Sequence, residues 1–254
     1  MIMTKTVTLW IGSLAILGLA ACTRTTTEQS KSTASGTTST APSGTDARSA
    51  DKALVRFVNA TPAAKDLYFG DVTAFSNVPA RTATGYTEVP SERHEFKLFD
   101  AGNAAMGNAL ATNSEGPTAG HHYTILALNG EDRKPMLDPI SDDLAQPDPG
   151  KAKLRVIDAA PGVKKVDIYV AGTRNALIDG VGFKDATGYK EVDPATTEID
   201  VRTAGSKSSA TKIGNLSLTA GKLYTLLVMG GNGQQLTSTV IEDQLVPTTT
   251  SSLR

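Results

Sequence analysis

The sequence has few of the side chains that usually carry chemistry. Its 254 residues include one cysteine, one tryptophan and three histidines, and aromatic residues make up only 5% of the chain. A single cysteine excludes an intramolecular disulfide and a metal site built from several cysteines. The 25 basic and 26 acidic residues nearly cancel, so the chain lacks the excess positive charge that binds a phosphate backbone, and we expect no nucleic-acid partner.

The one cysteine follows an apolar segment near the start of the chain. Residues 7–19 are mostly apolar, and two alanines and Cys22 come directly after them. The segment is shorter than the roughly 20 apolar residues of a membrane span, and its pattern is typical of an export signal. Its end resembles the lipobox of bacterial lipoproteins. The resemblance implies a signal peptide at residues 1–21, cleavage between Ala21 and Cys22, and attachment of membrane lipid to Cys22.

The lipobox resemblance also implies where the protein lies. Thr23 follows the cysteine, whereas an aspartate at this position commonly marks retention in the inner membrane of Gram-negative bacteria. We therefore expect an exported protein that is lipid-anchored in the bacterial cell envelope. It would lie in the outer membrane if the organism has one, and otherwise on the outer face of the cell membrane.

A segment rich in threonine and serine separates the cysteine from the rest of the chain. Residues 23–50 contain 9 Thr and 6 Ser, and almost no apolar side chain larger than alanine. Such a segment cannot bury enough surface to offset the entropy of ordering. We predict a disordered tether at residues 22–50 with a root-mean-square reach of about 30 Å.

An internal repeat occupies the remainder of the sequence. RFVNATP at residues 56–62 matches RVIDAAP at 155–161, and ATGY at 83–86 recurs at 186–189, so the offset stays between 99 and 103 residues. This spacing is too long for a solenoid and indicates a tandem domain duplication. The predicted segments are repeat 1 (51–137), a linker rich in proline and aspartate (138–151), repeat 2 (152–245) and a disordered C-terminal tail (246–254).

Apolar residues in both repeats recur with a period of two. Val166, Ile168 and Val170, for example, alternate with polar or amphipathic neighbours, which is the pattern of half-buried strands. We predict an all-β protein with two tandem antiparallel Greek-key β-sandwich domains, either immunoglobulin-like or transthyretin-like. Tyr123 and Tyr224 each lie three residues after a glycine, a spacing similar to the tyrosine corner of such sandwiches.

Several strings carry a more specific resemblance. LRVIDAAPG at 154–162 is followed by VDIYV at 166–170 and TGY at 187–189. Together they resemble the bacterial domain-of-unknown-function family 4397 (DUF4397). Repeat 1 is similar but looser, with Thr61 in place of an alanine and Ala63 in place of a glycine. The resemblance implies an exported, often surface-anchored β domain that is frequently found in tandem, and it brings no catalytic residues.

Histidine, the usual general base near neutral pH, offers no site common to both repeats. His94, His121 and His122 each align with a different residue type in repeat 2. Adjacent strand residues point to opposite faces, so His121 and His122 are poorly placed to share a metal ion. We predict that the protein is not an enzyme and has no cofactor and no metal site.

Acidic residues, whose carboxylate oxygens can bind calcium, gather between the repeats. They are Asp138, Asp142, Asp143 and Asp148. Their spacing is not that of an EF-hand. We interpret them as part of a solvated, proline-rich linker.

Four pairs of polar residues occur at matching positions of both repeats. They are Arg56 and Arg155, Asn59 and Asp158, Asp66 and Asp167, and Glu88 and Glu191. Two equivalent ligand sites would explain them. Fold maintenance would explain them too, because an aspartate can accept hydrogen bonds from backbone N–H groups and an arginine can hold a carboxylate across strands. We favour the structural interpretation.

These features predict a lipid-anchored envelope protein that acts as a non-enzymatic interaction, adhesion or structural module held off the membrane. The alternative is a ligand-binding lipoprotein with one site per repeat, for a glycan, a peptide or a cell-wall fragment. Removal of residues 1–21 would also remove the one tryptophan, which weakens the glycan hypothesis because sugars often stack on exposed aromatic rings. A hydrolase is the third hypothesis.

Overall fold

The computed structural model describes residues 52–243 apart from residues 94, 105–106 and 115. The signal peptide, Cys22, the tether at 22–50, the tail at 246–254 and His94 lie outside the described residues, so what was expected of them stays a prediction. No helix in the described part of the chain is long and apolar enough to cross a membrane.

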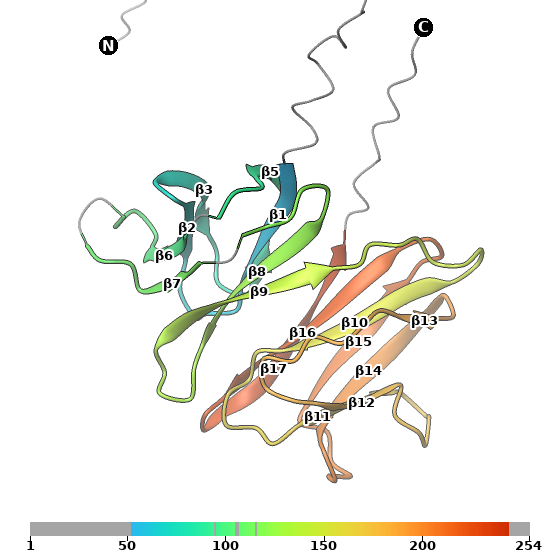
Figure 1. The fold of residues 1–254 in the computed structure, drawn as a ribbon. Coiled ribbons are helices and arrows are strands. Elements are labelled where there is room, and N and C mark those ends of the chain that lie inside the picture. Colours follow the sequence, from blue (N-terminus) through green and yellow to red (C-terminus); the bar gives the residue numbers. More distant parts are fainter. Residues whose placement is uncertain (1–51, 94, 105–106, 115, 244–254) are drawn as a thin grey trace, which may run out of the picture. The chain divides into compact units, whose positions relative to one another are not determined.

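Repeat 1, in its described residues, is a β-sandwich of nine strands (Figure 1). The strands are β1 (Lys52–Asn59), β2 (Lys65–Phe69), β3 (Val72–Val78), β4 (Thr82–Ala83), β5 (Thr87–Pro90), β6 (Phe96–Asp100), β7 (Ala111–Asn113), β8 (His122–Asn129) and β9 (Pro135–Asp142). One sheet has the order β4-β1-β8-β9, with β5 also paired to β1, and the other has the order β3-β2-β6-β7. Phe57, Leu67, Leu98 and Ile125 lie in the apolar core of this repeat.

Repeat 2 is a second sandwich, with eight strands in the part that the structure describes. The strands are β10 (Ala152–Asp158), β11 (Val166–Val170), β12 (Ile178–Val181), β13 (Lys190–Val192), β14 (Ala195–Thr203), β15 (Thr211–Leu218), β16 (Leu223–Gly231) and β17 (Gln234–Asp243). Its sheets have the orders β13-β10-β16-β17 and β12-β11-β14-β15. Their core includes Val156, Ile168, Val201 and Leu226. The prediction of an all-β protein built from sandwiches is therefore confirmed.

Both repeats have the same topology. With the strands of repeat 2 lettered a to h in chain order, one sheet is d-a-g-h and the other is c-b-e-f, and repeat 1 matches when β4 and β5 together count as strand d. The immunoglobulin arrangement places strands A, B, E and D in one sheet and C, F and G in the other. The observed order excludes that alternative and leaves the transthyretin-like one.

One strand pair in each repeat departs from the predicted antiparallel pairing. β1 runs parallel to β8, with Arg56 opposite Thr124, and β10 runs parallel to β16, with Arg155 opposite Thr225. The alternation of apolar residues reports which side chains share a face and carries no information on strand direction. The parallel pairs could not have been read from it.

The tyrosine corner occurs in both repeats, as the sequence predicted. The Thr118 N–H group donates a hydrogen bond to the Tyr123 hydroxyl, and the Thr219 N–H group donates one to the Tyr224 hydroxyl, each at 3.1 Å. Each tyrosine thus ties the start of its strand to the preceding turn.

The connection between the repeats is shorter than the linker predicted at 138–151. Strand β9 continues through Asp138 to Asp142, so residues 143–151 alone separate it from β10. Pro139 is tolerated in β9 because this strand lies at the edge of its sheet, where a missing N–H group leaves no ladder bond unmade. The composition of this stretch suggested a linker, but part of it is strand.

The sheets that contain β1 and β10 are buried on both faces. Phe57 lies in the core of repeat 1, whereas Val58, on the other face of β1, packs with Ile157 and Leu227 of repeat 2. Both repeats lie in one compact unit, Ser43–Arg254. Burial on two faces explains why β16 is an almost unbroken apolar run, LYTLLVMGG, rather than an alternating one.

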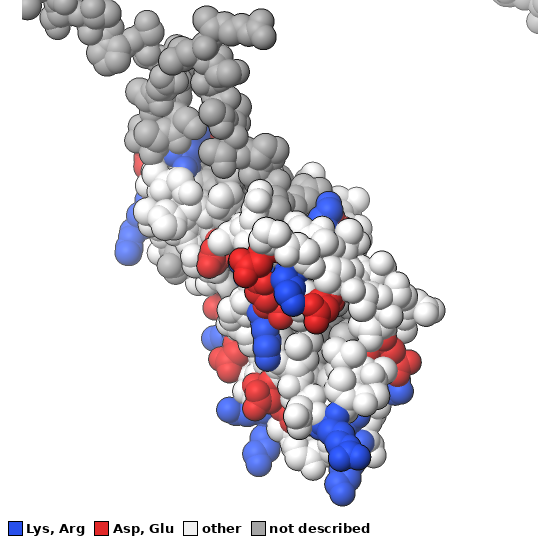
Figure 2. All heavy atoms as spheres, turned by 90° about the vertical axis from the view of Figure 1, so that its right-hand side faces the viewer, with Lys and Arg blue, Asp and Glu red and all other residues white. Residues whose placement is uncertain are grey.

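Acidic and basic side chains are interspersed over most of the face of the molecule that Figure 2 shows. Several of the exposed charges pair with one another, such as Lys212 with Glu198 and Lys222 with Glu242, both at 2.7 Å. Solvent-exposed pairs of this kind add little to stability. The ion pairs with the greatest burial lie between the repeats.

Candidate functional site

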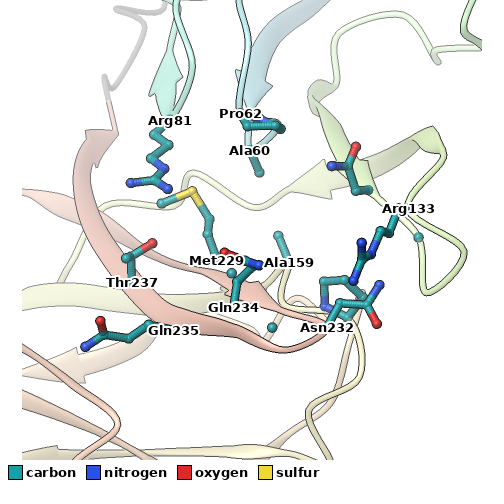
Figure 3. Close-up of a pocket in the computed structure, with 15 residues that line it drawn as sticks. Ala60, Pro62, Arg81, Arg133, Ala159, Met229, Asn232, Gln234, Gln235 and Thr237 are labelled. Carbon is teal, nitrogen blue, oxygen red and sulfur yellow. The ribbon is translucent and has the colours of Figure 1, made fainter.

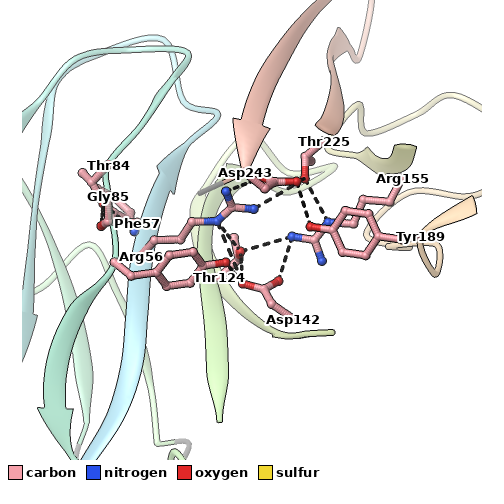
Figure 4. A network of polar contacts seen from close by, with 11 residues as sticks. Arg56, Phe57, Thr84, Gly85, Thr124, Asp142, Arg155, Tyr189, Thr225 and Asp243 are labelled. Carbon is pink, nitrogen blue, oxygen red and sulfur yellow. Dashed lines mark hydrogen bonds and ion pairs between the residues drawn. The ribbon is translucent and has the colours of Figure 1, made fainter. Parts of the chain in front are cut away.

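A buried network of polar side chains joins the two repeats (Figure 4). We call it the inter-repeat network, and it consists of Arg56, Tyr86, Thr124 and Asp142 of repeat 1 and the matching Arg155, Tyr189, Thr225 and Asp243 of repeat 2. Arg56 and Arg155 are each only 2% exposed. Four full charges are therefore held out of water at this contact.

The ion pairs of the inter-repeat network cross from one repeat to the other. The Nη1 atom of Arg56 donates a hydrogen bond to Oδ1 of Asp243. In the mirrored contact, Nη2 of Arg155 lies 2.7 Å from Oδ1 of Asp142. Each guanidinium thus has its close counter-charge in the other repeat, and the four charges sum to zero.

Threonine hydroxyls connect each arginine to the aspartate of its own repeat. Nε of Arg56 donates to Oγ1 of Thr124 at 2.8 Å, and that hydroxyl donates to Oδ2 of Asp142 at 2.7 Å. The corresponding distances in repeat 2, from Arg155 through Thr225 to its aspartate, are 2.9 and 2.6 Å. The two halves are near-copies because the registers of the parallel pairs are the same.

Two tyrosines complete the network. The hydroxyl groups of Tyr86 and Tyr189 donate to Oδ2 of Asp142 and Asp243, at 2.6 and 2.7 Å. Burial raises the pKa of both hydroxyls, so they stay protonated and remain donors. The guanidinium carbon of Arg155 lies 4.7 Å from the centre of the Tyr189 ring, which adds a cation–π contact.

The electrostatic balance keeps Arg56 charged. Burial by itself lowers the pKa of this guanidinium, but the negative charge of Asp243 and the nearby Tyr86 and Asp142 raise it, and the net direction is upward. Removing one partner of such a buried pair leaves a charge without compensation, which costs far more than breaking an exposed pair.

Sequence reasoning found two of the four charged residues of this network. It singled out Arg56 and Arg155 as a matching pair, but it interpreted Asp142 as a linker residue and did not single out Asp243. A signal was available, because Ile140-Ser141-Asp142 matches Ile241-Glu242-Asp243 at an offset of 101. Thr124 and Thr225 have the same offset.

The other matched acidic residues bond within their own repeats. Asp66 accepts hydrogen bonds from the N–H groups of Asn77 and Gly102, at 2.6 and 2.8 Å, and Asp167 accepts one from Gly180 at 2.8 Å. The three donors have positive φ, between 49° and 77°. Each aspartate therefore fixes left-handed turns beside its strand, which fits the structural interpretation.

Glu88 and Glu191 lie at the surface. Glu88 meets the Lys52 ammonium at 2.5 Å, and Glu191 accepts a hydrogen bond from the Asp148 N–H group at 2.9 Å. The structure does not bring either glutamate together with the arginines of the inter-repeat network.

Asn59 and Asp158 hold the turn that follows the first strand of each repeat. Oδ1 of Asn59 accepts from the Thr61 N–H group at 3.0 Å, and its Nδ2 donates to backbone oxygens, including that of Ala63 at 2.8 Å. Oδ1 of Asp158 accepts from Ala160 at 2.9 Å, but its Oδ2 is buried with no hydrogen-bond partner among the described residues. Burial, with the charge of Asp185, raises the pKa of Asp158 to about 6.

A pocket of about 470 Å³ opens at the other end of the contact between the repeats (Figure 3). We call it the inter-repeat pocket. Its walls include Ala60 and Pro62 from the turn that Asn59 holds, and the matching Ala159 and Pro161 of repeat 2. The matched string Ala-x-Pro of both repeats therefore meets at one site.

Arg81, from the turn between β3 and β4, also lines the inter-repeat pocket, and hairpin residues line the rest. Asn129, Gly130 and Arg133 come from the β8–β9 hairpin, and Met229 to Asn232, Gln234, Gln235 and Thr237 come from β16, β17 and their turn. Asn232 Nδ2 donates to the Glu131 backbone oxygen at 2.7 Å and so joins the two hairpins.

Glycine is required where the β16–β17 hairpin approaches the turn of its own repeat. Gly231 has φ of 73°, and a Cβ atom there would lie 2.2 Å from the Pro161 backbone oxygen. β16 and β17 pair antiparallel through this turn. The glycine-rich string GGNG at residues 230–233 therefore forms a hairpin turn.

The two described histidines lie away from the inter-repeat pocket. The His122 ring is 5.4 Å from the Tyr86 ring in an edge-to-face contact, and burial lowers the pKa of its imidazole. Neither His121 nor His122 lines the pocket. In the described part of the chain, no group of three or more His, Cys, Asp or Glu side chains is placed to hold a metal ion.

Comparison with known proteins gives one family match. The profile of DUF4397, described as a domain of unknown function, matches residues 53–169 and residues 154–254. No curated protein matches.

Two solved structures show a distant likeness. The C-terminal domain of AlgF from P. aeruginosa is 22% identical, with 37% of this chain and 98% of that chain covered and a TM-score of 0.31. A streptococcal virulence factor, whose structure is described as alpha-glucan binding, is 12% identical, with 72% and 95% covered and a TM-score of 0.23. Both TM-scores are below 0.5, so neither likeness supports an inference about this chain.

The first prediction concerns the crossed ion pair between Arg56 and Asp243. Asp243→Ala removes the closest counter-charge of a buried guanidinium and leaves it with Asp142 alone, at 3.9 Å from Nε. We expect the free energy of unfolding to fall by about 3–5 kcal/mol. Arg56→Met combined with Asp243→Leu removes both charges and should recover most of that loss. Urea unfolding of the parent, of Arg56→Met and Asp243→Leu as single variants, and of the double variant measures the coupling.

Glu242→Ala is the matched control, because Glu242 precedes Asp243 in the chain but pairs with Lys222 at the surface. We expect it to cost less than about 1 kcal/mol. Equal losses for Glu242→Ala and Asp243→Ala, or a coupling energy near zero, would contradict the role of the crossed pair.

The second prediction concerns pH. An aspartate in an unfolded chain titrates near pH 3.9, whereas the pKa of Asp158 in the folded chain is about 6. The folded state therefore holds this proton more tightly than the unfolded state does. The contribution of the protonated carboxyl to folding stability is fully present below about pH 4 and is lost as the pH rises through about 6. We expect Asp158→Asn to raise the free energy of unfolding by roughly 1–3 kcal/mol at pH 7.5, with a smaller gain at pH 4.

Asn59→Asp is the matched reverse change in repeat 1. It should place a carboxylate in the same buried position and should destabilise the protein more at pH 7.5 than at pH 4. Chemical denaturation at both pH values gives the comparison. A gain for Asp158→Asn that is the same at both pH values would show that titration of Asp158 is not its cause.

Proposed function

Because the chain belongs to the DUF4397 family, a family of domains of unknown function, we propose a function from its own geometry: it is a lipid-anchored, non-enzymatic envelope protein that binds a small ligand between its two repeats. The observation that carries this proposal is the inter-repeat pocket, where the matched Ala-x-Pro turns meet. Its volume of about 470 Å³ lies in the range of small-molecule sites. The site is one per chain, in place of one per repeat.

Rigidity supports this proposal. Arg56 is four residues before Ala60, and Arg155 is four residues before Ala159. The crossed ion pairs therefore fix the same two strand ends whose turns line the inter-repeat pocket. A site held by buried and mutually satisfied contacts needs little ordering when a ligand binds, and this saves binding free energy.

The environment of the chemical side chains supports binding over catalysis. The arginines and aspartates of the inter-repeat network are buried, and the half-buried tyrosines donate hydrogen bonds to the aspartates. Their charges and hydroxyl groups are taken up by contacts within the network, and the pocket that reaches Arg56 and Tyr86 has a volume of only about 130 Å³. The lining of the inter-repeat pocket supplies arginine, amide and hydroxyl groups, which bind and orient ligands but are weak general bases near neutral pH.

The start of the chain supports display from a membrane. The predicted tether ends at residue 50 and β1 begins at Lys52, so the folded unit follows the tether almost directly. With Cys22 acylated, the sandwiches would stand about 30 Å from the lipid on average. Such a distance leaves the inter-repeat pocket open to soluble or wall-bound ligands.

The third prediction tests the anchor. Cys22→Ala removes the thiol that would accept lipid, so we expect the protein to move from the membrane fraction to the soluble fraction of the envelope. Thr23→Ala, the adjacent change, should leave it with the membranes. Fractionation with immunoblotting measures both, and retention of Cys22→Ala in the membrane fraction would contradict the lipid anchor.

The fourth prediction tests the inter-repeat pocket. Ala60→Leu places a larger side chain in the wall and reduces the volume of the pocket, whereas Ala60→Ser leaves that volume almost unchanged. We expect members of a panel of neutral sugars, acidic sugars and short peptides to raise the thermal unfolding temperature of the parent and of Ala60→Ser, and to have little effect on Ala60→Leu. A ligand at 100 times its Kd adds about 2.7 kcal/mol. A panel in which no compound distinguishes Ala60→Leu from the parent would favour a purely structural or adhesive role.

A further inference from the structure

We propose that the ligand of the inter-repeat pocket carries an oxyanion, a carboxylate or a phosphate, and that Arg81 and Arg133 bind it. This inference rests on the proposed function, because it names the chemical class of ligand for the same site. Both arginines line the pocket. Figure 3 shows them on opposite sides of it, with Met229 and Gln234 between them.

The two guanidinium groups have no partner in the described residues. Arg56, Arg155 and Arg202 each form ion pairs with aspartates. Arg81 and Arg133 take part in no side-chain hydrogen bond or ion pair with another described residue, and both are exposed. A guanidinium presents planar N–H groups that match a carboxylate or a phosphate with two hydrogen bonds.

The backbone at both arginines is held in a conformation that large side chains rarely adopt. The φ angles are 61° at Arg81 and 64° at Arg133. The Arg81 N–H group donates to the Asn59 backbone oxygen at 2.7 Å, and that of Arg133 donates to Gly130 at 2.9 Å. Left-handed residues other than glycine, asparagine and aspartate are costly and concentrate at functional sites.

The charge of the lining favours an anion. Among the residues that the structure describes, no aspartate or glutamate lines the inter-repeat pocket. The nearby Asp132 accepts the Lys134 N–H group at 3.0 Å and lies 3.2 Å from its ammonium, so its charge is already compensated. The two arginines therefore leave the pocket with an uncompensated positive charge.

Neutral polar groups complete the site. Asn129, Gln234 and Gln235 offer amide donors and acceptors. The Thr237 hydroxyl is buried and has no hydrogen-bond partner in the described part of the chain. The combination suits a small molecule that has hydroxyl or amide groups beside its anionic group.

Three sugars of the same ring size separate the alternatives. D-glucuronate carries a carboxylate, glucose 6-phosphate carries a phosphate, and glucose carries neither. Each is titrated into the full mature chain with Cys22→Ala, and amide chemical shifts are followed by NMR. The same titrations on Arg81→Gln and Arg133→Gln test the arginines. Arg174→Gln, an exposed arginine that does not line the pocket, is the control.

We expect at least one anionic sugar to shift the amides of Gly130 and Gly231 and to bind at least tenfold more tightly than glucose. Comparison of the two anionic sugars decides between carboxylate and phosphate. Arg81→Gln and Arg133→Gln should each weaken that binding by about 5- to 20-fold, and Arg174→Gln should leave it unchanged.

Two results would overturn the inference. If glucose binds as tightly as both anionic sugars, or if neither arginine substitution weakens binding, the oxyanion is not recognised, although a ligand site between the repeats would still stand. If none of the three sugars shifts the amides at the pocket, the oxyanion inference fails. The neutral sugars and peptides of the panel described above then decide separately whether the pocket binds any ligand.

Discussion

Two arginines and two aspartates buried between the repeats determine how the two repeats must pack against each other. A charge moved out of water is tolerated only when an opposite charge and hydrogen bonds replace the lost hydration. Here the replacement for Arg56 comes from Asp243, and that for Arg155 comes from Asp142. Neither repeat can satisfy its own arginine as well as the other repeat does. The repeats must therefore meet face to face, and β9 and β17 must extend far enough to deliver their last aspartates.

The two repeats contact each other through crossed pairs, as the two subunits of a symmetric dimer do, although they belong to one chain. In a two-fold interface, residue i of one subunit contacts residue j of the other, and j contacts i in return. The Arg–Asp contacts follow this rule, and so does the apolar cluster that contains Val58 and Ile157. A single chain differs from a homodimer in one respect, since its two halves can diverge. Asn59 in repeat 1 and Asp158 in repeat 2 already differ in this way, at one position with the same task.

The sequence predicted what depends on local pattern and missed what depends on the meeting of the repeats. Alternating residues such as Val166, Ile168 and Val170 predicted the strands, and the spacing from Gly221 to Tyr224 predicted the tyrosine corner. Alternation cannot predict the strands of the sheets that are buried on both faces. Strand β16, for example, is apolar on both faces and shows no alternation. Asp142 lies beside prolines and other acids, so its composition suggests a linker. Its contacts with Thr124 and with Arg155 of the other repeat, which composition does not reveal, show that it is buried.

The same strands that carry the charges also explain where a ligand site can form. The matched string begins with an arginine of the inter-repeat network on β1 or β10. It reaches an alanine and a proline of the inter-repeat pocket four and six residues later, in the turn that follows the strand. Strict symmetry would give this pocket two equal halves. Instead its arginines come from repeat 1 and most of its amide side chains come from repeat 2. Because the ion pairs fix the framework, the hairpin residues around it are free to diverge, and an asymmetric ligand can be recognised by a site built from two equivalent turns.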